Sequence, residues 1–440
     1  MTQPATWESS GAGDRVAILG GGVTGALCAV RLAERGFRVT VLEKAHIGNG
    51  SSSRSAAGIR AQWSVEETIR GLRYAEWWYG QLHEALSTPS ERRQPAMRRN
   101  GYLFLYEDPA RVEPERRAEV AAAWALGREN MARQRAAGAH VDALDSSEIA
   151  RRWPWLAADR LIGAAWGPDD GFLHPHVIYG EGFRRARELG VEVWTETEAL
   201  GASGQGGRIT TLETSRGPLE VDWVVNATNA WAPRVSQRLG GMTLPISPVK
   251  RYLYHFEPTR PIVDAAEWER LPMIIFGIGP GRGAHARPDG PLLLLGGAAA
   301  AAPEPDFADG DQDTIRDGFN HAIGLENAAY ELLAQVDDFS PALANCGGIK
   351  ATTCGFYAMS PDGSPLIGRD TQLDNLIHAA GFSGHGVMHA PVTALLVEAL
   401  LAGDARDGAV TLPEGFGAIH LGAFDPARDF SAARIESAVL

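Results

Sequence analysis

The segment RVAILGGGVTGALCAVRLAERGFRVTVLEK, residues 15–44, decides the fold of this chain. Residues 16–19 form a short apolar run, which is typical of a buried parallel strand. The glycines of a G-x-G-x-x-G pattern follow, at Gly20, Gly22 and Gly25. From Val23 the apolar residues take helical spacing, and residues 37–42 then alternate as a second strand that ends at Glu43. The segment therefore predicts one βαβ unit.

Each part of this unit fits the binding of a dinucleotide. The first glycine allows a tight turn, the second lets a pyrophosphate approach the backbone, and the third lets helix and strand pack closely. The helix N-terminus offers N–H groups to phosphates, and the Glu43 carboxylate can accept hydrogen bonds from a ribose. A glycine turn that binds nothing is the alternative, but it would not need strand, helix, second strand and acidic residue in register. The unit predicts dinucleotide binding without indicating which dinucleotide.

The composition narrows the class of protein. A chain of 440 residues is long enough for about two domains. The 41 basic and 54 acidic residues give a net charge of -13, which argues against nucleic acid or an anionic membrane as a partner. No apolar run is long enough to span a membrane. The cysteines have no metal-ligand spacing, so we expect no metal site. Residues 1–14 lack the features of a signal peptide, and we expect a flexible tail and a cytoplasmic protein.

The remaining sequence indicates a second domain that interrupts the first. A long Gly- and Ser-rich loop follows Glu43, and a loop of this length usually has a function. From residue 243 the chain is rich in predicted strands; in one of them Lys250, Tyr252 and Tyr254 share a face and Arg251 lies on the other. We expect an α/β protein with a Rossmann-like dinucleotide-binding domain and a second α+β substrate domain on a mainly antiparallel sheet. The expected ranges are 15–88, 145–240 and 348–440 for the first domain, and 89–144 and 241–347 for the second.

A second glycine-rich turn, GFSGHG at residues 381–386, indicates which dinucleotide is bound. This turn also lies between a predicted strand and a predicted helix. A nicotinamide enzyme rarely needs a second close approach of backbone to ligand, whereas backbone donors and a helix N-terminus can stabilise a reduced flavin ring. An ordinary glycine turn is the alternative. His385 could act as a base, but its place in this turn favours a structural histidine whose backbone contacts the ligand.

Five segments, in sequence order, resemble the glycine/D-amino-acid oxidase-like (DAO) family of FAD-dependent oxidoreductases, near its sarcosine oxidase β-subunit and hydroxyproline dehydrogenase branch. The segments are VAILGGGVTG…VTVLEK, GSSSRSAAGIRAQW, VVNATNAWAP, FYAMSPDGSPLIG and AAGFSGHGVMHAP. The resemblance implies an extended, bound FAD. The residues expected to bind it are Gly20, Gly22, Val23, Thr24, Gly25, Glu43, Lys44, Ser51, Ser52, Arg54, Ser55, Ala56, Ala199, Ala227, Thr228, Gly381, Ser383, Gly384, His385, Gly386, Val387 and Met388.

The resemblance also implies a substrate pocket over the flavin, between the two domains. Arg60 matches an arginine that binds the substrate carboxylate, for which a guanidinium fork is well suited. Tyr357 matches a tyrosine of the same pocket, and Lys250 is a candidate for promoting the reaction with oxygen. The alternatives are a surface ion pair for Arg60, a core tyrosine and a solvated lysine. Met388 stands where monomeric sarcosine oxidases complete the carboxylate clamp with a lysine.

Three further positions depart from the resemblance. The cysteine that tethers the flavin in monomeric sarcosine oxidases corresponds to Gly355, with Cys354 one position away, and the tethering histidine of dimethylglycine dehydrogenases corresponds to Ser55. We therefore expect noncovalent FAD. Asn229 in VVNATN stands where the family usually has glycine, and the sequence offers no explanation for it.

These observations predict FAD-dependent oxidation of a C–N bond in an amine or amino acid. Hydride would pass from the α-carbon to flavin N5 and leave an imine, and oxygen or an electron-acceptor protein would reoxidise the flavin. Two alternatives stay open: an FAD-dependent 2-hydroxy acid or alcohol dehydrogenase, and a non-catalytic FAD-binding subunit of a hetero-oligomer. A plain NAD dehydrogenase fits the second glycine turn less well.

Overall fold

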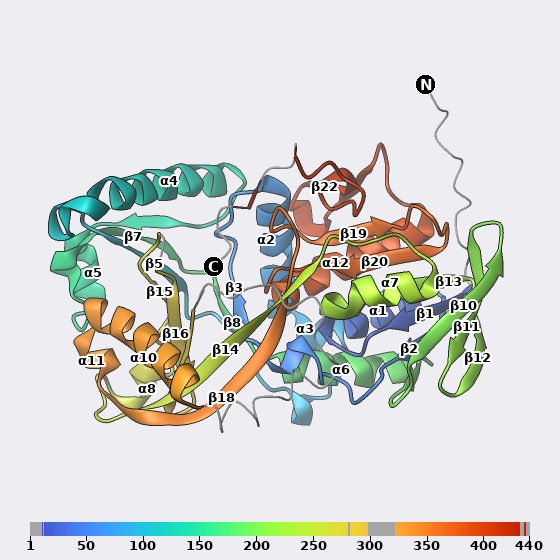
Figure 1. The fold of residues 1–440 in the computed structure, drawn as a ribbon, viewed down its shortest axis with the longest axis horizontal. Helices are drawn as coiled ribbons and strands as arrows, with labels where there is room; N and C mark the ends of the chain where they lie inside the picture. The colour runs from blue at the N-terminus through green and yellow to red at the C-terminus, as the bar shows by residue number, and fades with distance from the viewer. Residues whose placement is uncertain (1–10, 12, 280–281, 298–321, 432–434, 437–440) are drawn as a thin grey trace.

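Two large sheets lie side by side along the longest axis of the protein (Figure 1). The computed structural model describes residues 11, 13–279, 282–297, 322–431 and 435–436. Most of the expected N-terminal tail, residues 1–10 and 12, lies outside the described residues. Within these described ranges, no helix is long and apolar enough to cross a membrane.

The first sheet has six strands in the order β19–β20–β13–β1–β2–β9. The central strands run parallel, and only β19 is antiparallel to its neighbour. The strands are β1 (Arg15–Leu19), β2 (Arg38–Leu42), β9 (Glu192–Trp194), β13 (Trp223–Asn226), β19 (Leu366–Arg369) and β20 (Leu376–Ala380). Since side chains alternate along β1, Val16 and Ile18 pack into the helical core, whereas Ala17 and Leu19 pack into a separate cluster on the other face. The predicted Rossmann-like arrangement is confirmed.

Helices and a small sheet cover this first sheet. Three helices pack together in the main core: α1 (Val23–Glu34), α6 (Pro175–Glu188) and α12 (Gly386–Ala402), with α2 (Glu66–Gly80) against α12. The other face carries β10 (Ala199–Gln205), β11 (Arg208–Thr214), β12 (Gly217–Glu220) and α7 (Ala232–Leu239). α12 is apolar on all sides, as expected of a helix buried between neighbours.

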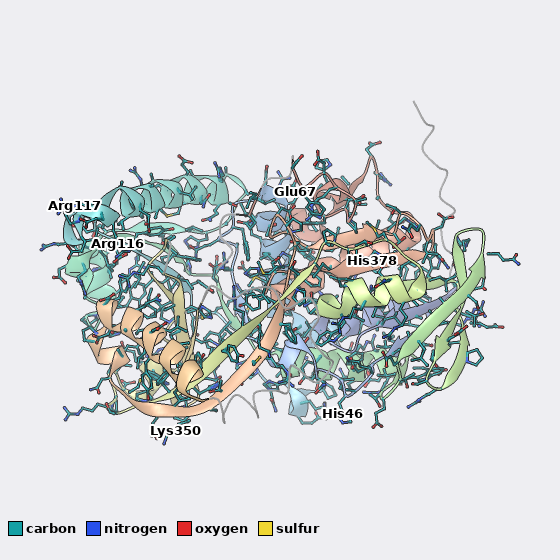
Figure 2. All side chains as sticks on the ribbon, viewed as in Figure 1. His46, Glu67, Arg116, Arg117, Lys350 and His378 are labelled. Atoms are coloured by element: carbon teal, nitrogen blue, oxygen red, sulfur yellow. The ribbon has the colours of Figure 1, made fainter. Side chains whose placement is uncertain are left out.

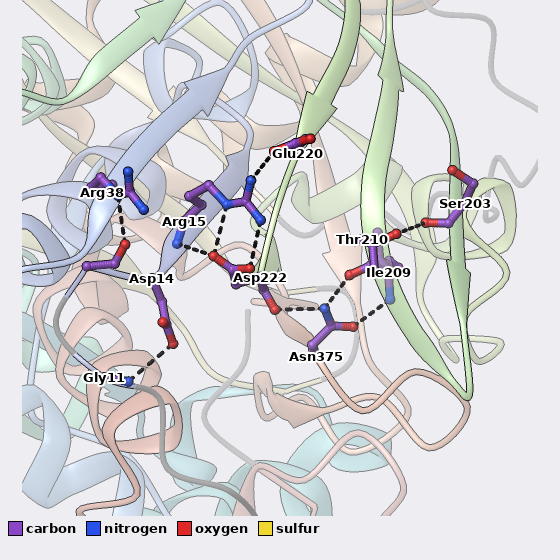
Figure 3. Close-up of polar contacts among 11 residues, drawn as sticks. Gly11, Asp14, Arg15, Arg38, Ser203, Ile209, Thr210, Glu220, Asp222 and Asn375 are labelled. Carbon is purple, nitrogen blue, oxygen red and sulfur yellow. Dashed lines mark hydrogen bonds and ion pairs between the residues drawn. The ribbon is translucent and has the colours of Figure 1, made fainter.

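Polar contacts at the start of β1 join these layers (Figure 3). The backbone N of Arg15 donates to Asp222 at 2.8 Å, and the Arg15 guanidinium donates to both oxygens of the same carboxylate at 3.0 and 2.9 Å. The Asn375 amide donates to the carbonyls of Ile209 and Asp222 at 2.7 and 2.8 Å, and accepts from the Ile209 N–H at 2.9 Å. These bonds hold three distant parts of the chain at one end of the sheet.

The second sheet has eight strands in the order β18–β14–β17–β16–β15–β5–β7–β6. All neighbours are antiparallel except β15 and β5. The strands are β5 (Tyr102–Glu107), β6 (Asp142–Leu144), β7 (Leu161–Gly167), β14 (Ser247–Pro258), β15 (Met273–Phe276), β16 (Ala284–Asp289), β17 (Leu292–Gly296) and β18 (Cys346–Met359). Leu103 and Leu105 face a core that includes α10 (Ala322–Phe339), whereas Tyr102 and Phe104 face the core shared with the first sheet. The predicted second, mainly antiparallel sheet is therefore present.

The remaining elements lie around these two sheets. They are β3 (Gly58–Ile59), β4 (Met97–Arg98), β8 (Gly171–Leu173), β21 (Ala409–Thr411), β22 (Ala418–His420), α3 (Leu82–Ala85), α4 (Arg117–Ala136), α5 (Ser146–Arg152), α8 (Ala265–Trp268) and α11 (Pro341–Ala344). β7 pairs within the second sheet although it falls in the range 145–240, and β18 crosses the expected boundary at residue 348. The domain boundaries stay a prediction, which these pairings refine.

Candidate active site

The candidate site consists of two adjoining cavities, and the larger of these begins at the G-x-G-x-x-G turn. Gly22 is the N-cap of α1, and the first two residues of the helix, Val23 and Thr24, line the cavity with it. Gly20 has a φ of +113°, and a Cβ there would lie 2.7 Å from the carbonyl oxygen of Ala227. Only glycine fits this position, because it lets the turn pack directly against the backbone at Ala227, which also lines the cavity.

The long loop after β2 folds back onto the same turn. Glu43 accepts hydrogen bonds from the N–H groups of Gly21 at 2.7 Å and Ala45 at 2.9 Å. The hydroxyl of Ser52, in the short helical turn η1 (Ser51–Ser53), accepts from the N–H of Val23 at 3.1 Å. The loop therefore forms a wall of the cavity, which accounts for its length.

This cavity has a volume of about 200 Å³ and extends from the glycine turn to β18 and the second glycine turn. Most of the predicted cofactor residues line it: Gly20, Gly22, Val23, Thr24, Glu43, Lys44, Ser51, Ser52, Arg54, Ser55, Ala199, Ala227, Thr228, Gly384, Gly386 and Val387. Sequence reasoning missed other lining residues, Asn49, Trp231, Arg234 and Arg238. Trp231 lies in the segment VVNATNAWAP, but the resemblance implies no role for its side chain. Asn49, Arg234 and Arg238 lie outside the five resembling segments, and they reach the cavity through the folded loop and α7.

Three predicted cofactor residues line neither cavity and support the turns instead. Gly25 packs against the carbonyl of Gly20, where a Cβ would clash. The Ser383 hydroxyl accepts from the N–H of Ser360 at 3.1 Å. Gly381 has a φ of +68° and no room for a side chain beside Leu366.

A smaller cavity of about 40 Å³ adjoins the larger one. Ser55, Tyr357, Gly384 and Val387 line both. The smaller cavity also receives Ala56, His385 and Met388 from the predicted cofactor set, together with Arg60, Tyr102, Met273 and His285. A ligand in the smaller cavity would therefore meet the end of a ligand in the larger one.

Arg60 is the cation of this smaller cavity and is only 1% exposed. Its guanidinium lies 3.9 Å from the centre of the Trp63 ring and 5.2 Å from that of Phe104. One of its nitrogens donates to the carbonyl of Gln62, and the Trp63 indole donates to the Arg60 carbonyl at 2.8 Å. Arg60 is buried and its guanidinium is held by aromatic rings. This environment fits the binding of an anion and does not fit the alternative role, a surface ion pair.

The second sheet places Arg251 on the same side as the smaller cavity. Val249 pairs with Tyr357 and Arg251 with Gly355, so Arg251 and Tyr357 share one face of the sheet. The Arg251 guanidinium lies 5.6 Å from the centre of the Tyr357 ring. Arg60 and Arg251 both favour the ionised form of Tyr357, but burial raises the pKa of this tyrosine and keeps the hydroxyl neutral. The sequence showed the two faces of this strand without showing which one the site uses.

Lys250 lies on the opposite face of the same strand. Its ammonium is 5.7 Å from the centre of the Phe356 ring, and it lines neither cavity. Lys350 lies farther along the sheet, at the outer edge, where it pairs with Glu257 at 2.8 Å (Figure 2). Cys354 shares the face of Lys250 through its pairing with Tyr252. The structure therefore does not bring Lys250 or Cys354 to Arg60 and Tyr357.

Neutral histidines complete the smaller cavity and its surroundings. Burial lowers the pKa of His285 to about 4, and burial together with the charge of Arg60 lowers that of His385 well below its usual value. Neither Nδ1 atom has a hydrogen-bond partner among the described residues. His389, one turn along α12, bonds to the carbonyl of His385 at 3.0 Å, and burial lowers its pKa to about 4. His285 carries no motif, so sequence reasoning missed it.

The structure also explains Asn229. Its φ is +49°, a left-handed conformation that glycine adopts freely and asparagine tolerates better than most residues. It lines the larger cavity, and its side-chain oxygen accepts from the N–H of Phe382 at 3.5 Å. Asn229 thus keeps the backbone of a glycine position and adds a contact to the second glycine turn.

A Rossmann-like sheet with an elongated dinucleotide cavity, closed at one end by an antiparallel sheet, defines a two-domain flavin-dependent oxidoreductase. The family model described as "FAD dependent oxidoreductase" (DAO) matches residues 15–400. The chain therefore belongs to this family and is an FAD-dependent enzyme. The glycine turn at the start of α1, and a cavity that extends from this turn to the second glycine turn, fit FAD.

Relatives of known structure or name cover nearly the whole chain. The crystal structure of L-proline dehydrogenase from P. horikoshii is 27% identical, with a TM-score of 0.74, and the match covers 96% of this chain and all of that one. Glycine oxidase from Geobacillus kaustophilus is 27% identical over 88% of this chain and 92% of its own length. FAD-dependent oxidoreductase domain-containing protein 1 of Xenopus laevis is 27% identical over 94% of this chain and 82% of its own.

Proposed function

We propose that this enzyme oxidises the C–N bond of an amine that carries a carboxylate, such as an amino acid. The observation that carries this proposal is the small cavity beside the FAD site, which, among the described residues, is lined by a buried arginine and by no acidic side chain. The similarity to a glycine oxidase and to an L-proline dehydrogenase supports the same substrate class.

Arg60 would bind the substrate carboxylate and so orient the α-carbon. Two guanidinium–carboxylate hydrogen bonds fix both position and direction, and positioning contributes much of the rate in such a reaction. Tyr102, Tyr357 and Met388 would exclude water from the rest of the cavity. The predicted cofactor residues that line the larger cavity would hold the FAD, which supplies the hydride acceptor when bound.

The charges of the cavity favour a neutral substrate amine. Arg60 lines the cavity and Arg251 lies beside it, and none of the described residues that line it is acidic. Nearby positive charge disfavours an ammonium group and lowers its pKa. His285 stays neutral, so its Nδ1 can accept a hydrogen bond from the amine N–H. A neutral amine is the form that can release a hydride from its α-carbon.

Anaerobic mixing of the purified holoenzyme with a panel of compounds tests the proposal. The panel includes amino acids, N-methyl amino acids, amines without a carboxylate and 2-hydroxy acids. We expect loss of the oxidised flavin absorbance with a carboxylate-bearing amine and with no hydroxy acid. Bleaching by hydroxy acids alone would establish the alcohol-oxidising alternative, and no bleaching by any compound would favour a non-catalytic subunit. Readmitting air then shows whether oxygen or a carrier accepts the electrons.

A further inference from the structure

A buried pair of carboxyl groups lies close to Arg60 and lines neither cavity. Glu76 extends from α2, and Asp170 lies in the turn between β7 and β8. Asp170 is 2% exposed and Glu76 is 6% exposed. Acidic side chains are rarely buried to this degree unless they are paired or strongly hydrogen-bonded, so this pair needs an explanation.

Asp170 holds the backbone that carries Arg60. One oxygen of its carboxylate accepts from the N–H of Ala61 at 3.0 Å, and the other accepts from the side-chain amide of Gln62 at 2.8 Å. The carbonyl of Gln62 in turn accepts from the Arg60 guanidinium. The same Gln62 amide donates to the carbonyl of Tyr102 at 3.0 Å. Asp170 therefore holds the two residues that follow Arg60, and one of them, Gln62, accepts a hydrogen bond from the Arg60 guanidinium.

The end of β7 is shaped to admit this carboxylate. Gly167 precedes the turn, and a Cβ at this position would overlap the Asp170 carboxylate and lie 2.8 Å from the Gln62 amide nitrogen. The backbone N–H of Gly101 also donates to the carbonyl of Asp170 at 2.9 Å. The position of Asp170 is thus built into the fold on several sides.

Contact between Glu76 and Asp170 requires a shared proton, because two ionised carboxylates would repel each other. Burial and the charge of Asp170 raise the pKa of Glu76 well above its usual value. Burial also raises the pKa of Asp170, but the hydrogen bonds from Ala61 and Gln62 favour its charged form. The other charged groups that face the pair are Arg60, Arg99 and Asp169. At neutral pH the proton therefore resides on Glu76, and Asp170 is the ionised member of the pair.

We infer that Asp170 and protonated Glu76 are positioning residues that hold the Arg60 guanidinium in the orientation in which it binds the substrate carboxylate. This inference rests on the proposed function, because it assigns Arg60 to that carboxylate. Neither acid touches the substrate. The two acids affect the affinity for the substrate carboxylate. When the hydrogen bond between the Arg60 guanidinium and Gln62 is weakened, the guanidinium takes more orientations, and fewer of them can bind the carboxylate.

The arrangement predicts a characteristic dependence on pH. When the pH rises through the raised pKa of Glu76, a second negative charge forms beside Asp170. Repulsion then loosens the contacts to Ala61 and Gln62, and the added negative charge opposes an anion at Arg60. Carboxylate affinity falls at high pH. In the variant E76Q the side chain keeps a donor for Asp170 and has no proton to lose, so affinity stays constant.

Titration of the holoenzyme with acetate tests this inference through changes in the visible flavin spectrum. Acetate is fully ionised above about pH 6, so any change in its Kd at higher pH reports on the protein. The variants are E76Q, D170N and the control E67Q, which alters a glutamate of the same helix near its outer end (Figure 2). Thermal unfolding and flavin content of each variant show that it is folded.

We expect the wild-type and E67Q Kd for acetate to rise about tenfold at high pH, whereas the E76Q Kd stays at the low-pH value. D170N offers one acceptor oxygen where two are needed, so we expect a Kd about tenfold weaker at every pH. Folded variants with the same Kd and pH profile as wild type would overturn the inference alone. No response of the wild-type flavin to acetate would overturn the proposed carboxylate site, and this inference with it.

Discussion

The guanidinium of Arg251 lies 5.6 Å from the centre of the Tyr357 ring, on the face of the second sheet that borders the smaller cavity. Arg60 lines the same cavity. An anion bound beside Tyr357 therefore meets two positive charges that come from different parts of the fold. This pairing gives a cationic site in a protein whose net charge is -13.

Removing the charge of Arg251 should weaken the binding of a substrate carboxylate. For R251M we expect KM to rise about tenfold with little change in kcat, because the lost attraction to a partly buried cation amounts to about 1.4 kcal/mol. Steady-state kinetics with the substrate found in the screen measures this. K350M removes a lysine from the edge of the same pair of strands and should leave KM unchanged. Equal KM values for both variants would show that Arg251 does not serve the site.

An alanine at Gly384 should impair the site without unfolding the protein. Its Cβ would clash with the Tyr357 ring, and the φ of +89° adds backbone strain. G190A is a matched control, because Gly190 has a φ of +88° and no atom within 4 Å of the added Cβ. The left-handed backbone should cost each variant about 1 kcal/mol of stability, and the clash with Tyr357 should cost G384A about 1–3 kcal/mol more. We expect kcat/KM to fall at least about tenfold in G384A alone, and equal kcat/KM in both variants would contradict the role of Tyr357.

The FAD should be released by acid. Cys354 is fully buried on the face of β18 opposite Tyr357 and lines neither cavity. Gly355 has no side chain with which to form a bond. After precipitation with trichloroacetic acid we expect a colourless pellet and all flavin in the supernatant, for both wild type and C354S. A yellow wild-type pellet would show a covalent link.

The buried histidines should make stability fall at acidic pH. The pKa of His389 is lowered to about 4 by burial, whereas in the unfolded chain it is about 6.5. Between these values the unfolded state binds a proton that the native state does not, so stability rises with pH. The contribution is about 1.4 kcal/mol per pH unit for one histidine.

Urea unfolding of wild type and H389Q at several pH values measures this effect. We expect the loss of stability between about pH 6 and pH 4 to be smaller in H389Q by about 2 kcal/mol. H46Q changes an exposed histidine and should follow the wild-type curve (Figure 2). Parallel curves for wild type and H389Q would show that His389 does not titrate between these limits.

The local patterns of the sequence predicted the fold well. The apolar runs, the glycine spacing and the change from period 2 to helical period all fall within short windows, and β1, α1 and β2 follow them. The position of Arg60 could be predicted because it sits in a segment that resembles the family. Its environment could not, since Trp63, Phe104 and Asp170 come from three different parts of the chain.

The sequence did not predict which face of each strand borders the site. Alternation separated Lys250 from Arg251, but a period of two assigns side chains to faces without showing what covers each face. The pairing of β14 with β18 and the position of the cavity decide this, and both depend on contacts between segments that are far apart in the sequence. His285 and the pair of Glu76 and Asp170 were missed for the same reason.

The strand order of the first sheet has a consequence for how the protein folds. β1 lies between β2, which follows it directly, and β13, which follows about 200 residues later, and β20 comes later still. The chain must therefore close very long loops before its central strand gains its second neighbour, and such high contact order slows folding. During synthesis β1 cannot pair with β13 until residues 223–226 have left the ribosome, when about half of the chain has been made. The FAD cavity is lined by residues from early and late parts of the sequence, so FAD would bind only after these parts have come together. Its binding would then stabilise the folded state.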